Sequence, residues 1–257
     1  MVLQFTKENG VATLKFNRPD KYNSFNQQLA FAVQKALDDC KNDEAIRAII
    51  LTGEGKAFCA GQDLAEATDP NGPPLEHIVG EHYNPIIMRL REIEKPIIAA
   101  VNGVAAGAGA NIALACDIVV AKKSAVFIQA FSAIGLIPDS GGTFFLPRLV
   151  GAQKALALML TGDKVSATEA ESMNMIYKAV EDDEFDHFVT KMASKMAKMP
   201  TKGFGLTKKA INASFNNTLE EQLAMEEKLQ AEAGSTKDFK EGTQAFLEKR
   251  KPVFVGK

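Results

Sequence analysis

The sequence has no tryptophan, and only three tyrosines, three histidines and three cysteines among its 257 residues. The cysteines, Cys40, Cys59 and Cys116, are an odd number and show no CxxC spacing. This pattern excludes a disulfide framework and a standard zinc site, and it suits a reducing compartment. We therefore expect a cytoplasmic protein without a metal centre.

Long apolar runs and a strong excess of one charge are missing as well. No stretch approaches the roughly 20 apolar residues of a membrane span, and residues 1–8 do not resemble a signal peptide. The chain carries 30 Lys and Arg against 32 Asp and Glu, for a net charge of −2. Because phosphate binding depends on clustered basic side chains, this balance argues against nucleic acid as a partner. We expect neither a membrane nor a nucleic acid as partner.

Three signatures of known enzyme classes are absent. The histidines, His77, His82 and His187, show no HExxH or other metal-ligand spacing. There is no Gly-x-Ser-x-Gly elbow of a Ser-His-Asp hydrolase. The segment 107–109 is not the GxGxxG of a dinucleotide fold, which disfavours NAD.

The order of apolar patterns predicts an α/β protein. Ala12, Leu14 and Phe16 alternate with polar residues, as in a half-buried strand. Further strands are predicted at 46–51, 97–101, 117–121 and 126–129, and the second of these is apolar throughout, which is typical of a buried parallel sheet. Ser24 and Gln27 are spaced as a capping box for the first helix.

Helical patterns dominate after Gly141. They predict helices at 152–160, 167–173, 184–199, 205–215 and 219–250. The predicted organisation is a core over residues 1–200, followed by a helical region over residues 201–257.

Two glycine-containing turns are candidates for a ligand site. Residues 56–64 follow a predicted strand, and residues 102–109 join another strand to a helix. Small residues allow the backbone to approach a ligand closely. Two such turns can present two N–H donors to one developing oxyanion, although tight helix–sheet packing explains the same residues.

Asp139 is the only acid in the otherwise uncharged segment 131–143. A carboxyl group in apolar surroundings has a raised pKa, which suits proton transfer. The alternative is that Asp139 caps a helix that begins near Ser140. The residue pattern alone favours neither interpretation.

The two turns, the segment 137–142, the early turn 18–24 and the closing segment 246–252 together resemble the crotonase (enoyl-CoA hydratase/isomerase) superfamily. The resemblance implies a four-turn ββα spiral, a helical C-terminal trimerisation region, trimers or hexamers, and acyl-CoA substrates. It implies that the N–H groups of Gln62 and Ala108 hold the thioester oxygen. No separate cofactor is implied, because coenzyme A is part of the substrate. Its contacts would lie at Lys21, Ala60, Asp63 and Leu64.

Two departures from the family pattern bear on the reaction. The hydratases use two glutamates to add water, and Asn111 and Phe131 stand at those positions here. The resemblance therefore predicts a poor hydratase that uses Asp139 as its single acid/base. Asn111 either orients the substrate or makes buried hydrogen bonds. Phe131 and Phe144 either line the acyl site or pack in the core.

A narrower resemblance concerns the ring-epoxide isomerases of this superfamily, which act in phenylacetate catabolism. It is carried by the segments 105–110, 130–139 and 245–250. It implies conversion of 1,2-epoxyphenylacetyl-CoA to oxepin-CoA and a shift of 3-enoyl-CoA to 2-enoyl-CoA. The alternatives are an aliphatic Δ3-Δ2-enoyl-CoA isomerase, an enoyl-CoA hydratase and a non-catalytic protein that binds acyl-CoA.

Overall fold

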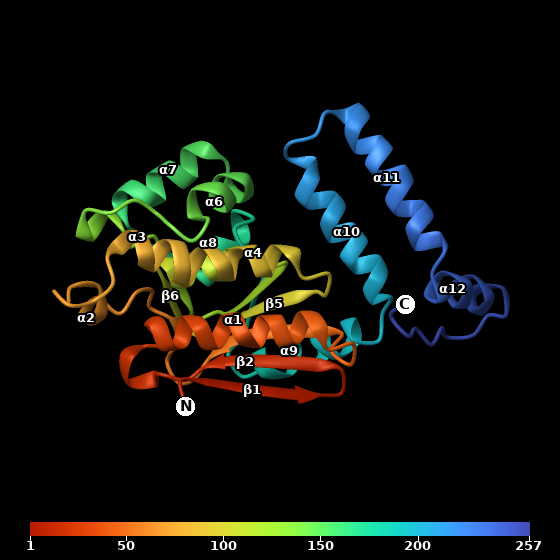
Figure 1. The fold of residues 1–257 in the computed structure, drawn as a ribbon, viewed down its shortest axis with the longest axis horizontal. Helices are drawn as coiled ribbons and strands as arrows, with labels where there is room; N and C mark the ends of the chain where they lie inside the picture. Colours follow the sequence, from red (N-terminus) through yellow and green to blue (C-terminus); the bar gives the residue numbers. More distant parts are fainter.

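The computed structural model describes residues 1–257 and contains two β-sheets enclosed by helices (Figure 1). The larger sheet has the strand order β1 (Leu3–Glu8), β2 (Val11–Phe16), β3 (Ala48–Gly53), β5 (Ile97–Val101), β7 (Ile118–Lys122) and β10 (Lys178–Val180). The smaller sheet has the order β4 (Ala57–Cys59), β6 (Val104–Ala106), β8 (Val126–Ile128) and β9 (Lys164–Ser166). Only the edge pairs β1–β2 and β8–β9 are antiparallel.

Four β-β-α units follow one another along the chain. In the last three units, the pairs β3/β4, β5/β6 and β7/β8 each place one strand in the larger sheet and the next in the smaller one. A single helix follows two of the pairs, α1 (Gln27–Asn42) after β2 and α5 (Ala108–Leu114) after β6. After β4 come α2 (Leu64–Ala67), α3 (Leu75–His77), η2 (Ile78–Tyr83) and α4 (Asn84–Glu92). After β8 come η3 (Ser132–Ile134), α6 (Gly142–Val150), α7 (Ala152–Thr161) and α8 (Ala167–Ser172). This is the predicted ββα spiral.

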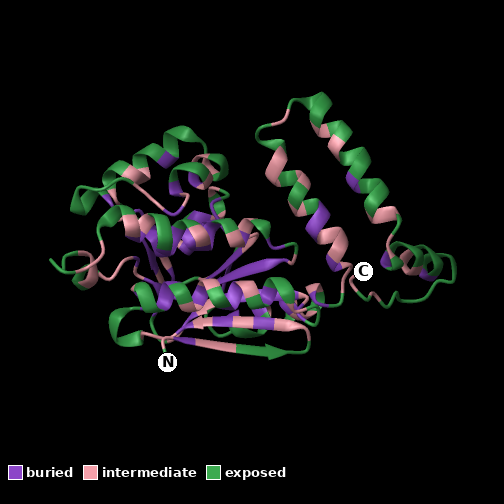
Figure 2. Cartoon of the chain, viewed as in Figure 1, coloured by how far each residue is buried: buried purple, intermediate pink, exposed green.

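Strand β5 shows why an entirely apolar segment becomes a central strand. All five of its side chains are buried, and β3 and β7 pair with it on either side. Ile98 and Ala100 pack with helix α9 (Phe185–Met196), whereas Ile97, Ala99 and Val101 belong to the main core. Since side chains alternate between the faces of a strand, both faces require apolar residues. Figure 2 shows the buried residues concentrated in these strands.

Three helix predictions differ from the structure, and one of them is a simple shift, because the helix predicted at 205–215 begins at Thr201. Helix α1 is capped by Asn26, whose side chain accepts the N–H of Leu29, and not by Ser24. The predicted helix 219–250 is two helices, α11 (Leu219–Gly234) and α12 (Lys237–Leu247). The break has a local cause, because the Thr236 side chain accepts the N–H of Phe239 and caps a new helix there.

The C-terminal helices stand away from the sheets. α10 (Thr201–Ser214) and α11 lie side by side, and α12 lies at their base (Figure 1). α10 begins next to the predicted boundary at residue 200, and the division of the chain into two parts there stays a prediction. No helix combines the length and apolar character needed to cross a membrane.

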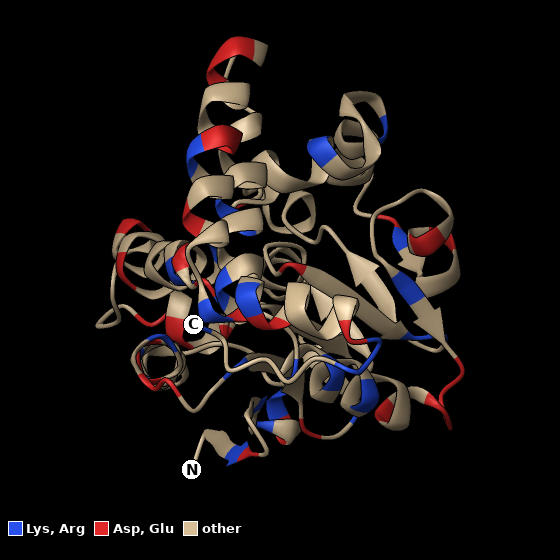
Figure 3. Cartoon of the chain, turned by 90° about the vertical axis from the view of Figure 1, so that its right-hand side faces the viewer, with Lys and Arg blue, Asp and Glu red and all other residues tan.

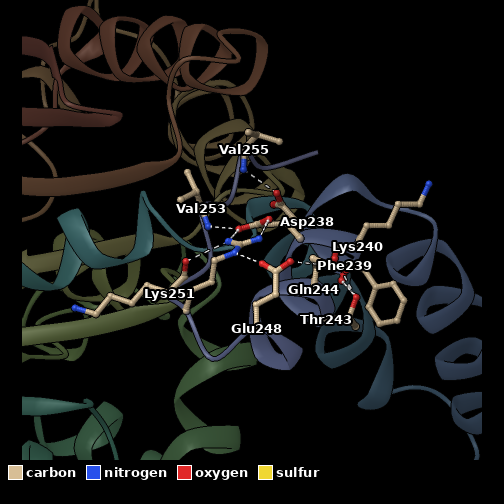
Figure 4. A network of polar contacts seen from close by, with 11 residues as sticks. Asp238, Phe239, Lys240, Thr243, Gln244, Glu248, Lys251, Val253 and Val255 are labelled. Atoms are coloured by element: carbon tan, nitrogen blue, oxygen red, sulfur yellow. Dashed lines mark hydrogen bonds and ion pairs between the residues drawn. The ribbon is translucent and has the colours of Figure 1, made fainter.

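A polar network fixes the end of the chain to α12 (Figure 4). The buried Asp238 carboxylate accepts the N–H groups of Val255 at 2.7 Å and Gly256 at 2.8 Å. Arg250 forms a bidentate pair with Glu241. The closing segment therefore folds back on the last helix.

Candidate active site

The two predicted turns lie against each other. Strands β4 and β6 are parallel neighbours, so the turns that leave their carboxyl ends meet at one edge of the smaller sheet. A Cβ atom on Gly61 would lie 3.0 Å from the Ala106 oxygen and 3.5 Å from the Ala108 nitrogen. Gly61 has a φ of 96°, which a residue with a side chain rarely adopts.

The turns bring two unpaired backbone donors together. Ala108 is the first residue of α5, so its N–H has no acceptor within the helix, and no side chain caps it. The N–H of Gln62 donates to no other group, although Phe25 pairs with both neighbouring residues. Two adjacent free N–H groups are the arrangement that binds an oxyanion.

The two glycines of the 107–109 segment differ in how closely they are packed. A Cβ atom on Gly109 would lie 2.3 Å from the Cys59 oxygen, so α5 lies directly on the end of β4. Gly107 has a φ of 53°. A Cβ atom on Gly107 would have the Phe131 ring as its nearest neighbour, at 3.8 Å. The packing interpretation therefore holds at Gly109, Gly107 leaves room beside the two N–H groups, and the oxyanion interpretation stays a prediction.

Asp139 lies in the loop between η3 and α6 and is partly buried. Burial raises the pKa of its carboxyl, and a 2.9 Å hydrogen bond from the Ser140 hydroxyl opposes that rise. The capping interpretation is wrong, because Gly141 occupies the N-cap position of α6 without any side-chain cap. The group is therefore suited to proton transfer.

Asn111 connects this loop to the oxyanion turn. It is completely buried; its Nδ2 donates to the Asp139 carbonyl oxygen at 2.9 Å, and its Oδ1 accepts from Gln129 at 2.8 Å. Both ends of the amide have protein partners, so Asn111 has the buried hydrogen-bonding role, and the substrate-orienting role stays a prediction. Asn111 follows Ala108 by three residues, a rise of about 4.5 Å along a helix. The hydrogen bond therefore ties the backbone of Asp139 to the first turn of the helix that begins at Ala108.

The two predicted aromatic residues differ in position. Phe131 is buried against Gly107, beside the donors. Phe144 instead stacks under the Arg148 guanidinium at 3.6 Å and lines a cavity of about 710 Å³ between α4, α6 and α10. That cavity does not include Asp139, Gln62 or Ala108.

The residues predicted to contact coenzyme A lie on two adjoining segments. Lys21 ends the short helix η1 (Pro19–Lys21). Tyr22 follows Lys21, and its carbonyl oxygen accepts the N–H of Ala60. The Asp63 carboxylate pairs with Arg18 at 2.7 Å and caps α2, so it serves the fold itself. Leu64 is exposed. The early turn and the 60–64 segment therefore form one surface beside the donors.

Tyr83 is a site residue that the sequence did not indicate. Its buried hydroxyl donates to the Gln62 side-chain oxygen at 2.7 Å, and Gln62 in turn donates to Glu66 at 3.0 Å. Burial is the main reason that the pKa of Tyr83 is well above its usual value, and the charge of Asp139 contributes. Tyr83 lies at the end of the π-helical turn η2, in a segment with no sequence signal of function.

The remaining polar candidates lie outside this arrangement. His77 pairs with Glu81, and His82 is buried against Phe31. No group of three or more His, Cys, Asp or Glu side chains is arranged to hold a metal ion. Lysines, arginines and acids are interspersed over the face shown in Figure 3.

Comparison with known proteins identifies the family. A family model described as enoyl-CoA hydratase/isomerase matches residues 6–257. The 1,2-epoxyphenylacetyl-CoA isomerase of Escherichia coli (strain K12) is 47% identical over 253 residues, which cover 97% of each chain. A Rhodobacter capsulatus protein named "probable enoyl-CoA hydratase" is 44% identical over 255 residues, covering 99% of this chain and 98% of its own. The structure of an enoyl-CoA hydratase from Bacillus anthracis matches with a TM-score of 0.93 at 32% identity, covering 100% of both chains. The predicted superfamily and fold are confirmed, and the chain belongs to the enoyl-CoA hydratase/isomerase family.

Proposed function

We propose that this protein is an acyl-CoA isomerase in which Asp139 is the single acid/base. The observation that carries the proposal is the partly buried carboxyl of Asp139, a residue whose main-chain oxygen Asn111 ties to the helix turn that presents a free N–H. The N–H groups of Gln62 and Ala108 bind the thioester oxygen. They stabilise the negative charge that this oxygen gains when the substrate becomes an enolate, and losing one such donor typically costs about 10²–10³ in rate.

The double-bond shift requires one proton to move between two carbons. Asp139, as the carboxylate, takes a proton from C2 of a 3-enoyl-CoA, and the electrons of the broken C–H bond delocalise onto the thioester oxygen. The protonated Asp139 then returns the proton at C4, and the double bond ends between C2 and C3. The raised pKa of Asp139 favours both halves of this exchange.

The proposed physiological substrate is 1,2-epoxyphenylacetyl-CoA, which would be converted to oxepin-CoA. The 47% identical E. coli relative bears this activity in its name, and the Phe131 ring beside the donors suits an aromatic acyl group. Asp139 would assist the rearrangement of the epoxide ring. An aliphatic Δ3-Δ2-enoyl-CoA isomerase uses the same groups and is the second candidate.

Hydration is the third candidate, since the R. capsulatus relative is named a hydratase. A hydratase needs a second group to activate water. Asn111 is buried with both ends of its amide occupied, and Phe131 has no polar atom. These two residues argue against efficient hydration.

Further parts of the proposal concern ligands, assembly and location. Coenzyme A enters as part of the substrate, along the surface formed by Lys21 and the 60–64 segment, and no separate cofactor takes part. We infer a homotrimer or hexamer, supported by the exposed apolar side chains of α10–α12. The proposed location is the cytoplasm.

The test is a chromatographic assay with three substrates. The wild-type protein is incubated with 1,2-epoxyphenylacetyl-CoA generated in situ, with 3-hexenoyl-CoA and with 2-hexenoyl-CoA. We expect oxepin-CoA from the first, 2-hexenoyl-CoA from the second and little 3-hydroxy product from the third. Turnover of 3-hexenoyl-CoA alone would support the aliphatic isomerase, hydration as the main activity would contradict the proposal, and binding without any turnover would indicate a non-catalytic protein.

A further inference from the structure

We propose that Asn111 is a positioning residue that sets the distance between the acid/base Asp139 and the oxyanion donor Ala108, and that Gln129 orients it. This inference rests on the proposed function and adds two residues to its site. Neither side chain needs to touch the substrate. Their task is to hold the proton-transfer group at a fixed place relative to the bound oxygen.

The loop that carries Asp139 has few other attachments. Leu136 to Pro138 are exposed or partly exposed, and Ser140 and Gly141 both have positive φ angles, of 51° and 75°. The Asp139 carbonyl oxygen accepts two hydrogen bonds, one from the Gly142 N–H at 2.8 Å and one from Asn111 at 2.9 Å. The bond from Gly142 is local, because α6 directly follows the loop, whereas the bond from Asn111 ties the loop to an element distant in the sequence.

The direction of the Asn111 amide follows from its neighbours. A backbone carbonyl oxygen can only accept, so the Nδ2 group of Asn111 must face Asp139 and its Oδ1 must face Gln129. Gln129 must therefore donate, which leaves its own buried Oε1 without a partner. An unpaired buried oxygen is energetically costly. Its presence indicates that the direction of these hydrogen bonds, from Gln129 to Asn111 and from Asn111 to Asp139, matters here.

Helix α5 relates the two parts of the site to each other. Its first turn carries Ala108 at one end and Asn111 at the other, and the Asn111 N–H donates to the Gly107 oxygen at 3.1 Å. Gly142 leaves room for the Asn111 amide, since a Cβ atom on residue 142 would lie 2.3 Å from the side-chain nitrogen Nδ2. Movement of this turn would displace the oxyanion donor and the acid/base together, which preserves their separation.

The first test replaces the amide by a slightly larger apolar side chain with the same number and branching of heavy atoms. For Asn111→Leu we expect kcat on 3-hexenoyl-CoA to fall about 10²-fold, with the Kd of the unreactive hexanoyl-CoA within about threefold of wild type. Ile112→Val, on the same helix, is the control for a small loss of packing and should keep its kcat. An unchanged kcat, or a Kd that weakens as much as kcat/KM falls, would overturn the proposal.

The second test uses the variant closest in shape. In Asn111→Asp the new carboxyl can donate to the Asp139 carbonyl oxygen only while it is protonated, and burial raises its pKa. The kcat of this variant should therefore fall as pH rises, whereas wild-type kcat rises as Asp139 ionises. A pH profile parallel to that of wild type would contradict a donor role for Asn111.

The third test does not depend on activity. Hydrogen–deuterium exchange over residues 135–145 should be faster in Asn111→Leu and in Gln129→Met than in wild type, and unchanged in Ile112→Val. Unchanged exchange in Asn111→Leu would overturn the anchoring role. If the wild-type protein converts neither 1,2-epoxyphenylacetyl-CoA nor 3-hexenoyl-CoA, the proposed function fails. The exchange experiment still decides whether Asn111 holds the Asp139 loop.

Discussion

At the scale of single residues, Asp139 is subject to two opposing influences. Burial disfavours its carboxylate and raises its pKa, whereas the hydroxyl of Ser140 donates to the carboxylate and lowers it. The reaction needs the carboxylate to take a proton from C2 and the acid to return it. A backbone hydrogen bond lowers the pKa of Asp139 as well, and we expect the balance between burial and these hydrogen bonds to set the acidic limb of activity.

Ser140→Ala should move the acidic limb of the kcat/KM profile to higher pH. The substitution removes the bond that favours the carboxylate, so the pKa of Asp139 rises further and a higher pH is needed to ionise it. Ser132→Ala, on the exposed turn η3, is the control and should leave the limb in place. A limb that stays fixed or moves to lower pH in Ser140→Ala would contradict the role given to this hydroxyl.

At the scale of elements, the site depends on how closely α5 approaches β4. Gly109 allows the helix to lie on the Cys59 carbonyl, and this contact places Ala108 beside Gln62. A side chain at residue 109 has no space, because the atom it would meet belongs to the backbone of a strand.

Gly109→Ala should therefore separate the two donors. We expect kcat/KM to fall by about 10²-fold or more, and the free energy of unfolding to fall by about 1–3 kcal/mol because of overpacking. Gly234→Ala in α11 has open space and is the matched control, with stability unchanged or raised by up to about 1 kcal/mol. Steady-state kinetics and urea unfolding of both variants measure these effects, and full activity in Gly109→Ala would contradict the account.

The elements also show what the sequence could predict. The apolar segment 97–101 and the glycines of the two turns identified a parallel sheet and a pair of adjoining turns, because local residue patterns determine both. Tyr83 and Gln129 were missed because their roles depend on partners far along the chain, Gln62 and Asn111. The division of the last helix was missed because the cap at Thr236 is a single side chain within a continuous helical pattern.

At the scale of the whole molecule, the C-terminal helices leave a large apolar area uncovered. Figure 2 shows α11 largely exposed and α10 partly buried, although several side chains on both helices are apolar. The exposed residues include Ile211, Phe215, Leu219, Leu223, Phe239, Phe246 and Leu247. Large apolar side chains exposed on three successive helices support assembly with further copies.

Light scattering after gel filtration should give a mass of three or six times 27.8 kDa. The double variant Phe246→Asp/Leu247→Asp should give a smaller mass, because two charges would be buried in the contact. Lys237→Asp, exposed on the same helix, changes the charge by the same amount and should keep the assembly. A wild-type protein that runs as a monomer would contradict the proposed trimer or hexamer.

The central claim is that Asp139 is the only group that moves the proton, and one comparison tests it most directly. Wild type and Asp139→Asn are assayed on 3-hexenoyl-CoA, and their affinity for hexanoyl-CoA is measured by calorimetry. The account predicts a loss of about 10²–10⁴-fold in kcat and similar affinity. The melting temperature at pH 7 should be at or above that of wild type, because a partly buried carboxyl whose charge burial disfavours is removed. Wild-type turnover by Asp139→Asn would contradict it.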